Sequence, residues 1–249
     1  MDILSTRLDQ IAAALARTPQ AIALVVVGSL GHDDSRKDAY SDLDFFVITK
    51  EGEAKTLIAD LSWLASAYPF NYYFKNTRDG YKILFSDGIY SEFAVFNSNE
   101  LINIPYTNAR LHWLRPGCQL SLEIANKIPI ESKNVDYYLN EALCNLYVGL
   151  SRYRRQEYYS SYLFICHYAL TNILKAHDRG TQSDPFDISR RLEKSHPELL
   201  PLLQASLQGY AHILESARTI ASNLSSHINY PNEMMNQVLS LLESLKEEE

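Results

Sequence analysis

Two aspartates separated by one residue open an apolar run in the first half of the chain. Asp42 and Asp44 belong to the segment SDLDFFVIT. If this segment is a strand, its side chains alternate between two faces, so both carboxylates lie on the same face. Two like charges so close together repel each other and resist desolvation, which makes the pair a liability in a purely structural role. We therefore expect the pair to hold one or two divalent cations.

A glycine and a serine directly follow an earlier apolar run. Gly28 allows a tight turn where the expected strand ends, and backbone N–H groups together with the Ser29 hydroxyl could receive phosphate oxygens. A metal site beside a phosphate cradle predicts phosphoryl or nucleotidyl transfer, because bound cations neutralise the charge that develops on phosphate oxygens. The loop before the aspartates contains His32, Arg36 and Lys37. It is either a solvated, charge-mixed loop or a cover over the phosphates.

A third acid lies in the later segment IYSEFAVF, whose other residues are apolar or small. Glu92 in this segment could serve as a further metal ligand or as a general base. The structural alternative is an acid at the edge of a strand, facing solvent. Together with the aspartates, Glu92 gives three carboxylates for the expected site.

The segments around these residues predict a mixed α/β unit. Apolar spacing favours a helix over residues 2–17 and strands over 21–27 and 41–49. A single helix is expected over 52–69. Two β-rich runs then flank Asp87-Gly88, a dipeptide that tolerates the positive backbone angles of a tight hairpin.

The second half of the chain has a different pattern. After the polar segment 126–134, which we interpret as a linker, the apolar spacing is helical, with helices expected near 198–225 and 231–246. The predicted fold class is therefore α+β, with a mixed-sheet domain over 1–130 followed by an all-α helical bundle over 131–249.

Composition narrows the function further. The chain has 249 residues, 46% of them hydrophobic, which is enough for a sizeable core in one or two domains. Its net charge of -7 and the lack of a long Lys/Arg tract disfavour a nucleic-acid partner. No apolar stretch approaches membrane-spanning length, and no basic segment leads into an apolar one at the start. Three widely spaced cysteines in apolar surroundings are typical of buried thiols in a reducing compartment: Cys118, Cys144 and Cys166. We expect a soluble cytoplasmic protein with no membrane partner.

The order of these motifs resembles the signature of the polymerase-β-like nucleotidyltransferase superfamily: Gly28-Ser29, then Asp42-x-Asp44 opening a strand, then an acid on a later strand. Three segments look more specifically like the lincosamide nucleotidyltransferases, and the likeness covers most of the chain. They are GSLGHDDSRKDAYSDLDFFVITK, YFKNTRDGYKILFSDGIYSEFAVFNSNELINI and LCNLYVGLSRYRRQEYYSSY. Those enzymes inactivate lincosamide antibiotics by attaching a nucleoside monophosphate to a hydroxyl. A similar helical C-terminal domain also occurs in aminoglycoside nucleotidyltransferases.

The resemblance implies a role for each candidate residue. Gly28 and Ser29 would hold the triphosphate, and Asp42 and Asp44 would bind Mg²⁺. Glu92 would be the third carboxylate, as a metal ligand or as the general base. The co-substrate would be a nucleoside triphosphate, most often ATP in the family, and the acceptor a hydroxyl of a small molecule, here a lincosamide-type antibiotic. Two features depart from the lincosamide enzyme: a somewhat longer loop before the aspartates, and Asp-x-Asp in place of Asp-x-Glu.

Other functions remain open from the sequence. The acceptor could be an aminoglycoside, because both drug classes carry amines. Related helical domains include ribonucleases with an arginine four to six residues before a histidine, and Arg191 and His196 have such a spacing. A non-catalytic, antitoxin-like partner protein is a further alternative, which the retention of all three acids disfavours. Relatives are often dimers, so a homodimer is also open.

Overall fold

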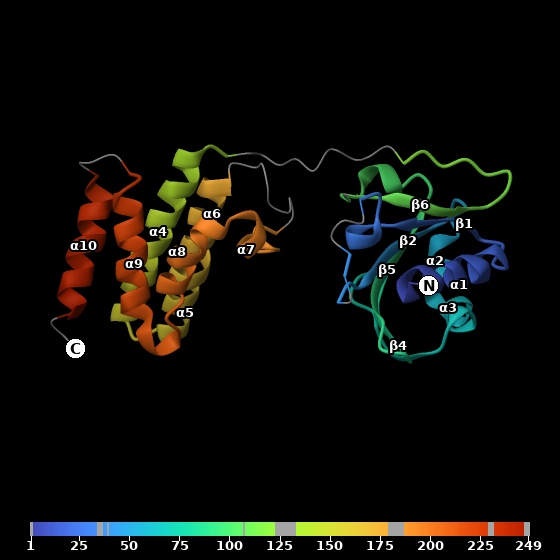
Figure 1. Ribbon diagram of the computed structural model, residues 1–249, viewed down its shortest axis with the longest axis horizontal. Helices are drawn as coiled ribbons and strands as arrows, with labels where there is room; N and C mark the ends of the chain where they lie inside the picture. The colour runs from blue at the N-terminus through green and yellow to red at the C-terminus, as the bar shows by residue number, and fades with distance from the viewer. Residues whose placement is uncertain are drawn as a thin grey trace. The chain divides into compact units, whose positions relative to one another are not determined.

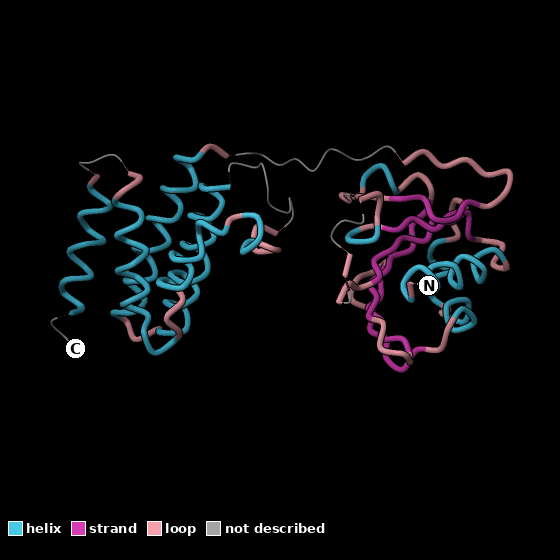
Figure 2. Tube along the Cα trace, in the orientation of Figure 1, coloured by secondary structure: helices cyan, strands magenta, loops and turns pink. Residues whose placement is uncertain are grey.

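The computed structural model describes residues 2–33, 37–38, 40–106, 108–122, 133–178, 187–228 and 232–246. The chain divides into two compact units, Met1–Pro129 and Ile130–Glu249, which follow each other along the colour bar of Figure 1. The strands belong to the first unit, and the regular elements described in the second unit are helical (Figure 2). The fold class is thus α+β, a mixed sheet followed by helices. Most of the predicted linker, residues 126–132, lies outside the described part of the chain.

The first unit is built on one six-stranded sheet with strand order β3-β4-β5-β2-β1-β6. Strands β2 and β5 are parallel, whereas the other neighbouring strands described are antiparallel, so the sheet is mixed. In chain order the elements are α1 (Ile3–Ala16), β1 (Ala21–Val26), η1 (Gly28–Leu30), β2 (Leu43–Thr49), α2 (Ala54–Ala59), α3 (Ser62–Ala67), β3 (Phe70–Phe74), β4 (Gly80–Phe85), β5 (Tyr90–Asn97), η2 (Leu101–Asn103) and β6 (Arg110–Leu114).

Helices α1, α2 and α3 cover one face of this sheet (Figure 1). Phe45 of β2 stacks on Phe93 of β5 with ring centroids 5.2 Å apart, and Trp63 of α3 packs edge-on against Phe93. Burying each such side chain contributes about 1.5–3 kcal/mol. Because side chains alternate along a strand, Asp44 and Glu92 lie on the opposite face. That face carries a smaller core formed with η2 and β6, so the carboxylates are not covered by the three helices.

The sequence predicted several of these elements. The helix over 2–17 and the strands over 21–27 and 41–49 are confirmed as α1, β1 and β2, and the hairpin at Asp87-Gly88 joins β4 to β5. Gly88 adopts a positive φ of 90°, as the tight turn requires. Strands β3 and β6 were not predicted.

The single helix expected over 52–69 is wrong: two short helices, α2 and α3, form instead. The break follows from Asp60, whose carboxylate accepts hydrogen bonds from both the backbone N–H and the hydroxyl of Ser62, each at 2.9 Å. A short polar side chain that bonds its own backbone two residues on competes with helical hydrogen bonding.

The second unit is a set of helices around its own core. In chain order its elements are α4 (Val135–Arg154), α5 (Tyr158–Tyr162), the π-helical η3 (Leu163–Ala169), α6 (Leu170–Asp178), α7 (Leu192–Ser195), η4 (Pro197–Leu199), α8 (Leu200–Ser206), η5 (Tyr210–His212), α9 (Ile213–Ser225) and α10 (Glu233–Lys246). One face of α4 supplies four leucines to the core: Leu139, Leu143, Leu146 and Leu150. None of the helices described combines the length and the apolar character needed to cross a bilayer.

Two sequence predictions for this unit need correction. The helix expected over 198–225 is interrupted between α8 and α9, where Gly209 has a φ of 93° that a helix cannot accommodate. The three cysteines are free, and Cys166 is buried as expected, but Cys144 is exposed because it lies on the outer face of α4. The helix expected over 231–246 is observed as α10, and its Pro231 lies outside the described residues.

Candidate active site

Gly28 turns the chain at the end of β1, directly against the side chain of Asp44. Val27 N–H donates to the Asp44 carbonyl at 3.0 Å, which holds the end of β1 beside β2. Gly28 has a φ of 69°, and a Cβ atom at this position would lie 3.0 Å from Asp44 Oδ2. Glycine is therefore needed for two reasons, the left-handed backbone and the close approach of the carboxylate.

Ser29 follows in η1, and its hydroxyl is buried without a hydrogen-bond partner among the described residues. A buried, unpaired hydroxyl destabilises the fold by the loss of its hydrogen bonds to water, so it points to a ligand that completes it. Phosphate oxygens are the ligand that the sequence predicts for this hydroxyl. The orphaned oxygen fits that assignment in kind.

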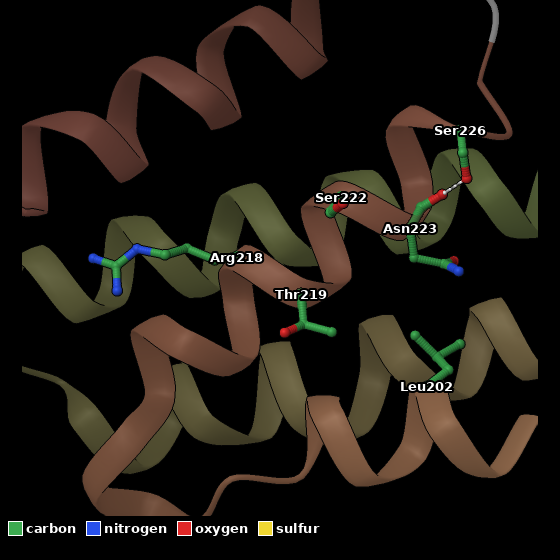
Figure 3. A pocket seen from close by; sticks show the side chains of 6 residues that line it. All are labelled: Leu202, Arg218, Thr219, Ser222, Asn223 and Ser226. Atoms are coloured by element: carbon green, nitrogen blue, oxygen red, sulfur yellow. Dashed lines mark hydrogen bonds between the residues drawn. The ribbon is translucent and has the colours of Figure 1, made fainter.

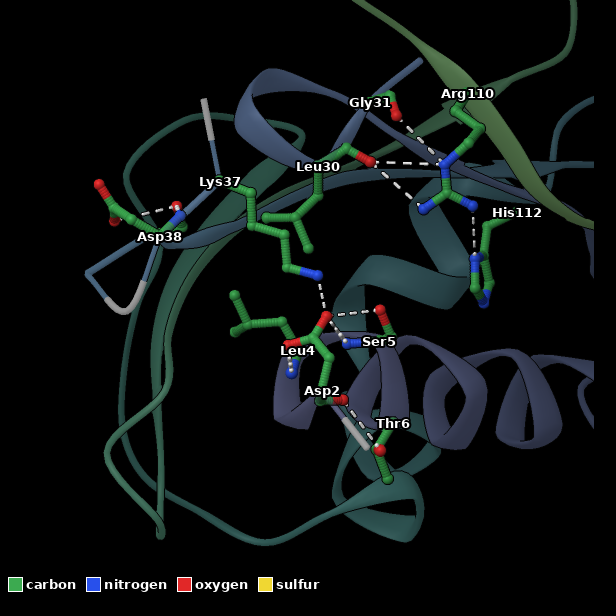
Figure 4. Close-up of polar contacts among 11 residues, drawn as sticks. Asp2, Leu4, Ser5, Thr6, Leu30, Gly31, Lys37, Asp38, Arg110 and His112 are labelled. Carbon is green, nitrogen blue, oxygen red and sulfur yellow. Dashed lines mark hydrogen bonds and ion pairs between the residues drawn. The ribbon is translucent and has the colours of Figure 1, made fainter. Parts of the chain in front are cut away.

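The segment after Gly28 is held from the start of β6 by two residues that the sequence did not reveal. The Asn108 amide donates to the carbonyl oxygens of Gly28 and Asp33, while its oxygen accepts from Asp33 N–H. Arg110 donates from Nη2 to the Leu30 carbonyl at 3.2 Å and from Nε to the Gly31 carbonyl at 3.2 Å (Figure 4). These side chains fix the turn that carries the candidate phosphate cradle.

Lys37, a candidate cover for phosphates, forms an ion pair with Asp2 (Figure 4). The same carboxylate caps α1 by accepting from the N–H groups of Leu4 and Ser5. The Lys37 ammonium is therefore engaged at the helix cap. His32 is exposed, and Arg36 lies outside the described residues.

The three predicted carboxylates are aligned on one face of the sheet. Asp44 and Glu92 are register partners across the parallel strands β2 and β5, and neighbouring strands lie about 4.8 Å apart. Asp42 immediately precedes β2, and continued alternation places its side chain on the face of Asp44. Asp42 and Asp44 are both half-buried. The predicted acids thus lie along one side of the sheet, with Asp44 directly beside Gly28.

Glu92 has two partners of its own. Asn76 Nδ2 donates to Glu92 Oε1 at 2.7 Å, and Lys82 Nζ lies 3.5 Å from Glu92 Oε2. The Glu92 carboxylate is the main cause, followed by Tyr90, of a raised pKa for the Lys82 ammonium. Asn76 and Lys82 were missed by sequence reasoning. Counting the register outward from the Asp87-Gly88 turn would have found Lys82, because that hairpin pairs Leu84 with Tyr90 and Lys82 with Glu92.

The side chains of this site are of the kinds that bind a magnesium-bound triphosphate. Carboxylate oxygens are the ligands Mg²⁺ prefers, Gly28 leaves space at Asp44, and the Ser29 hydroxyl lacks a partner. Within the described ranges, no three His, Cys, Asp or Glu side chains converge to hold one metal ion. The types of side chain therefore suit magnesium, but the carboxylates lie in a row and do not converge on one point.

The histidine on which the ribonuclease alternative depends, His196, is buried. His196 has a side chain only 7% exposed, and its ring nitrogens lie 2.9 Å from Asp178 Oδ1 and from Glu198 Oε1. These carboxylates, Asp178 first, raise the pKa of His196. Arg191 adopts a left-handed backbone, with a φ of 58°, at the start of α7. The buried imidazole bridges the two carboxylates within the helical unit.

A groove of about 680 Å³ lies between α8 and α9 in the helical unit. Figure 3 shows Leu202 of α8 facing α9. The other lining residues come from α9 and the turn after it: Arg218, Thr219, Ser222, Asn223 and Ser226. None of the predicted site residues lies in this groove. It offers one guanidinium and several hydroxyls, but no carboxylate among its lining residues.

Two solved structures are similar to the chain over most of its length. An aminoglycoside 6-adenyltransferase from Bacillus subtilis matches with a TM-score of 0.35 and 13% sequence identity, over 98% of this chain and 96% of that chain. A nucleotidyltransferase-like protein from Exiguobacterium sibiricum matches with a TM-score of 0.35 and 12% identity, over 89% of this chain and 74% of that chain. No family model and no curated protein matches the chain. At TM-scores this low neither likeness bears on function.

Proposed function

We propose that this chain is a magnesium-dependent nucleotidyltransferase, which transfers a nucleoside monophosphate from ATP or another nucleoside triphosphate to a hydroxyl of a small molecule. The observation that carries the proposal is the register pairing of Asp44 with Glu92, directly beside the close approach of Gly28 to Asp44. Aligned acids next to a turn with an orphaned hydroxyl suit a phosphate ester and its metal.

In this proposal Asp42 and Asp44 hold magnesium, and Gly28 and Ser29 receive the triphosphate. Magnesium, when bound, neutralises charge on the phosphate oxygens. Glu92 acts as the general base. It accepts the proton of the acceptor hydroxyl while that oxygen forms a bond to the α-phosphorus. The bond from the α-phosphorus to the bridging oxygen breaks, and pyrophosphate leaves with the electron pair.

The partners of Glu92 support a base over a third metal ligand. An amide N–H and an ammonium already lie at its two oxygens, at 2.7 Å and 3.5 Å. Hydrogen-bond donors at these positions occupy oxygen lone pairs that a metal ion would need, so they compete with a cation for the carboxylate.

For the acceptor we propose a lincosamide-type antibiotic, with an aminoglycoside as the alternative. The proposal places the reaction in the cytoplasm, where ATP and magnesium are available. It requires no nucleic-acid and no membrane partner, in keeping with the net charge of -7. A homodimer is compatible with it.

The test is pyrophosphate release with ATP or GTP and magnesium, against a panel of lincosamides and aminoglycosides, with mass spectrometry of each acceptor. An acceptor that gains the mass of a nucleoside monophosphate identifies the reaction. Asp42→Asn should abolish this mass gain of the acceptor while the circular dichroism spectrum stays unchanged. Glu51→Gln, which alters an exposed acid after β2, should leave the mass gain as in the wild type. Near wild-type rates in Asp42→Asn would refute the metal assignment. A wild-type protein that binds magnesium and ATP but modifies no acceptor would favour the non-catalytic alternative.

A further inference from the structure

A row of register partners crosses four strands on the face that carries the carboxylates. Asp44 of β2 pairs with Glu92 of β5, Glu92 pairs with Lys82 of β4, and Lys82 pairs with Phe74 of β3. Partners in register project from the same face of a sheet. The row therefore runs from the proposed metal site, through the proposed base, to an ammonium and then to an aromatic ring.

A second row lies next to the first on the same face. Tyr90 pairs with Leu84, and Leu84 pairs with Tyr72. These three residues and Phe74 of the first row are all substantially exposed: Tyr90 by 39%, Leu84 by 38%, Tyr72 by 55% and Phe74 by 53%. We call these four residues the apolar platform. A contiguous group of exposed apolar side chains marks a site of interaction.

We propose that the apolar platform binds the acceptor and selects a molecule with an apolar surface next to its reacting hydroxyl and no more than one positive charge. This inference rests on the proposed function. The register places the platform directly beside Glu92, so a molecule lying on it can present a hydroxyl to the carboxylate.

Two features beside Glu92 point to such an acceptor. Lys82 lies between Glu92 and Phe74 in the row and already pairs with Glu92, and none of the four platform residues carries a carboxylate, so the further amines of a polycation find no anionic partner there. Asn76, whose amide N–H group is bonded to Glu92, adds an uncharged polar group beside the base rather than a carboxylate that would attract cations.

The test uses lincomycin, which has a single basic amine, and kanamycin, which has several. Binding of lincomycin is measured by equilibrium dialysis with magnesium and a non-hydrolysable ATP analogue present. Because dialysis is separate from turnover, it distinguishes the platform from the proposed reaction. Pyrophosphate release with ATP tests the reaction itself.

Strand β3 offers a matched control for the rings. Tyr73 lies between Tyr72 and Phe74 and is equally exposed, at 60%, but it faces the other side of the sheet and packs near Tyr81. The double variant Tyr72→Ser, Phe74→Ser should weaken lincomycin binding by about tenfold or more, because two apolar contact surfaces are lost. Tyr73→Ser should change it by less than about twofold.

The charge is tested in the same way. Lys82→Gln should raise the ratio of kcat/KM for kanamycin over that for lincomycin by about threefold or more. Lys75→Gln serves as its control, because Lys75 lies on the same hairpin with its ammonium over the Tyr81 ring. A ratio is used because Lys82 also contacts Glu92, and a loss of base function would lower both rates together.

Three outcomes would overturn the inference. If lincomycin is turned over while the double variant binds it as well as Tyr73→Ser does, the proposed function stands and the platform does not. If lincomycin neither binds nor reacts, the assignment of a lincosamide-type acceptor to the platform is wrong. Sedimentation that shows a wild-type dimer converted to monomers by the double variant would assign the platform to a second copy of the chain.

Discussion

Asp44 and Glu92 stand opposite each other on adjacent parallel strands, on the sheet face that helices α1 to α3 leave uncovered. The turn at Gly28 approaches Asp44 from one side, and Asn76 and Lys82 contact Glu92 from the other. The two acids therefore share a face but have different surroundings. Asp44 lies next to the candidate phosphate cradle, and Glu92 lies next to the apolar platform.

Replacing Glu92 by Gln should lower kcat by about 10²-fold or more, because the amide cannot accept the proton of the acceptor hydroxyl. The affinity for magnesium and nucleotide should stay close to that of the wild type. Steady-state pyrophosphate release and calorimetric titration with ATP measure the two quantities, with Glu51→Gln as the control. Loss of magnesium binding in Glu92→Gln would show that the carboxylate is a metal ligand.

Gly28→Ala should lose both stability and activity. The positive φ makes alanine unfavourable by about 1 kcal/mol, and its Cβ atom would press on Asp44 Oδ2. Gly52→Ala is the matched control, because Gly52 has a φ of 80° and no heavy atom within 4 Å of the added Cβ. Both variants should lower the urea midpoint, Gly28→Ala more than Gly52→Ala because of the contact with Asp44, but only Gly28→Ala should lose pyrophosphate release. Equal activity in the two would remove the link between the turn and the site.

Ser29→Ala should weaken nucleotide binding without destabilising the fold. Its hydroxyl has no partner in the described part of the chain, so its removal breaks no hydrogen bond seen there, whereas a bond to phosphate would be lost, raising the ATP dissociation constant by about tenfold. Ser91→Ala should destabilise the fold without weakening nucleotide binding. The fully buried Ser91 hydroxyl donates to the Leu43 carbonyl at 2.6 Å, so its loss should lower stability by about 1 kcal/mol and leave ATP affinity nearly unchanged. Unchanged ATP affinity in Ser29→Ala would contradict the cradle.

The stability of the helical unit should fall as the pH rises through the folded pKa of His196. Asp178 and Glu198 stabilise the imidazolium, so the pKa of His196 is higher in the folded protein than in the unfolded chain. The contribution of the ion pairs is thus complete below the unfolded pKa, about 6.5, and is lost as the pH rises through the folded value. Urea midpoints measured between about pH 6 and pH 9 should show this slope in the wild type and not in His196→Gln. His212→Gln, which removes an exposed imidazole, should keep the wild-type slope; a slope that persists in His196→Gln would contradict the assignment.

The predicted site residues came from local patterns. Gly28 was identified from a turn after an apolar run, and Asp42 and Asp44 from alternation along one strand. Each of these signals is contained within a few residues, so it survives without knowledge of the tertiary structure. Glu92 was identified as a lone acid in an otherwise apolar segment, and the position of its strand beside that of Asp44 is a finding of the structure.

The surroundings of the site depended on contacts that no local pattern encodes. Asn108 and Arg110 reach the Gly28 turn from residues about eighty positions along the chain. Strand β3 has exposed side chains on both faces, so it lacks the alternation by which half-buried strands are found. The break at Asp60 arose because a carboxylate two residues before Ser62 outcompeted the helical pattern.

The parallel pairing of β2 with β5 has a consequence for how the protein folds. The strands meet across a separation of 48 residues, as the bond from Ser91 to Leu43 shows, and the intervening chain contains two helices and a hairpin. Contacts between residues so distant in sequence carry a loop-closure cost that is recovered only when the rest of the unit is in place. A nascent chain that ends before β5 contains Gly28, Ser29, Asp42 and Asp44 but no site, so activity should begin only after the whole sheet has been synthesised.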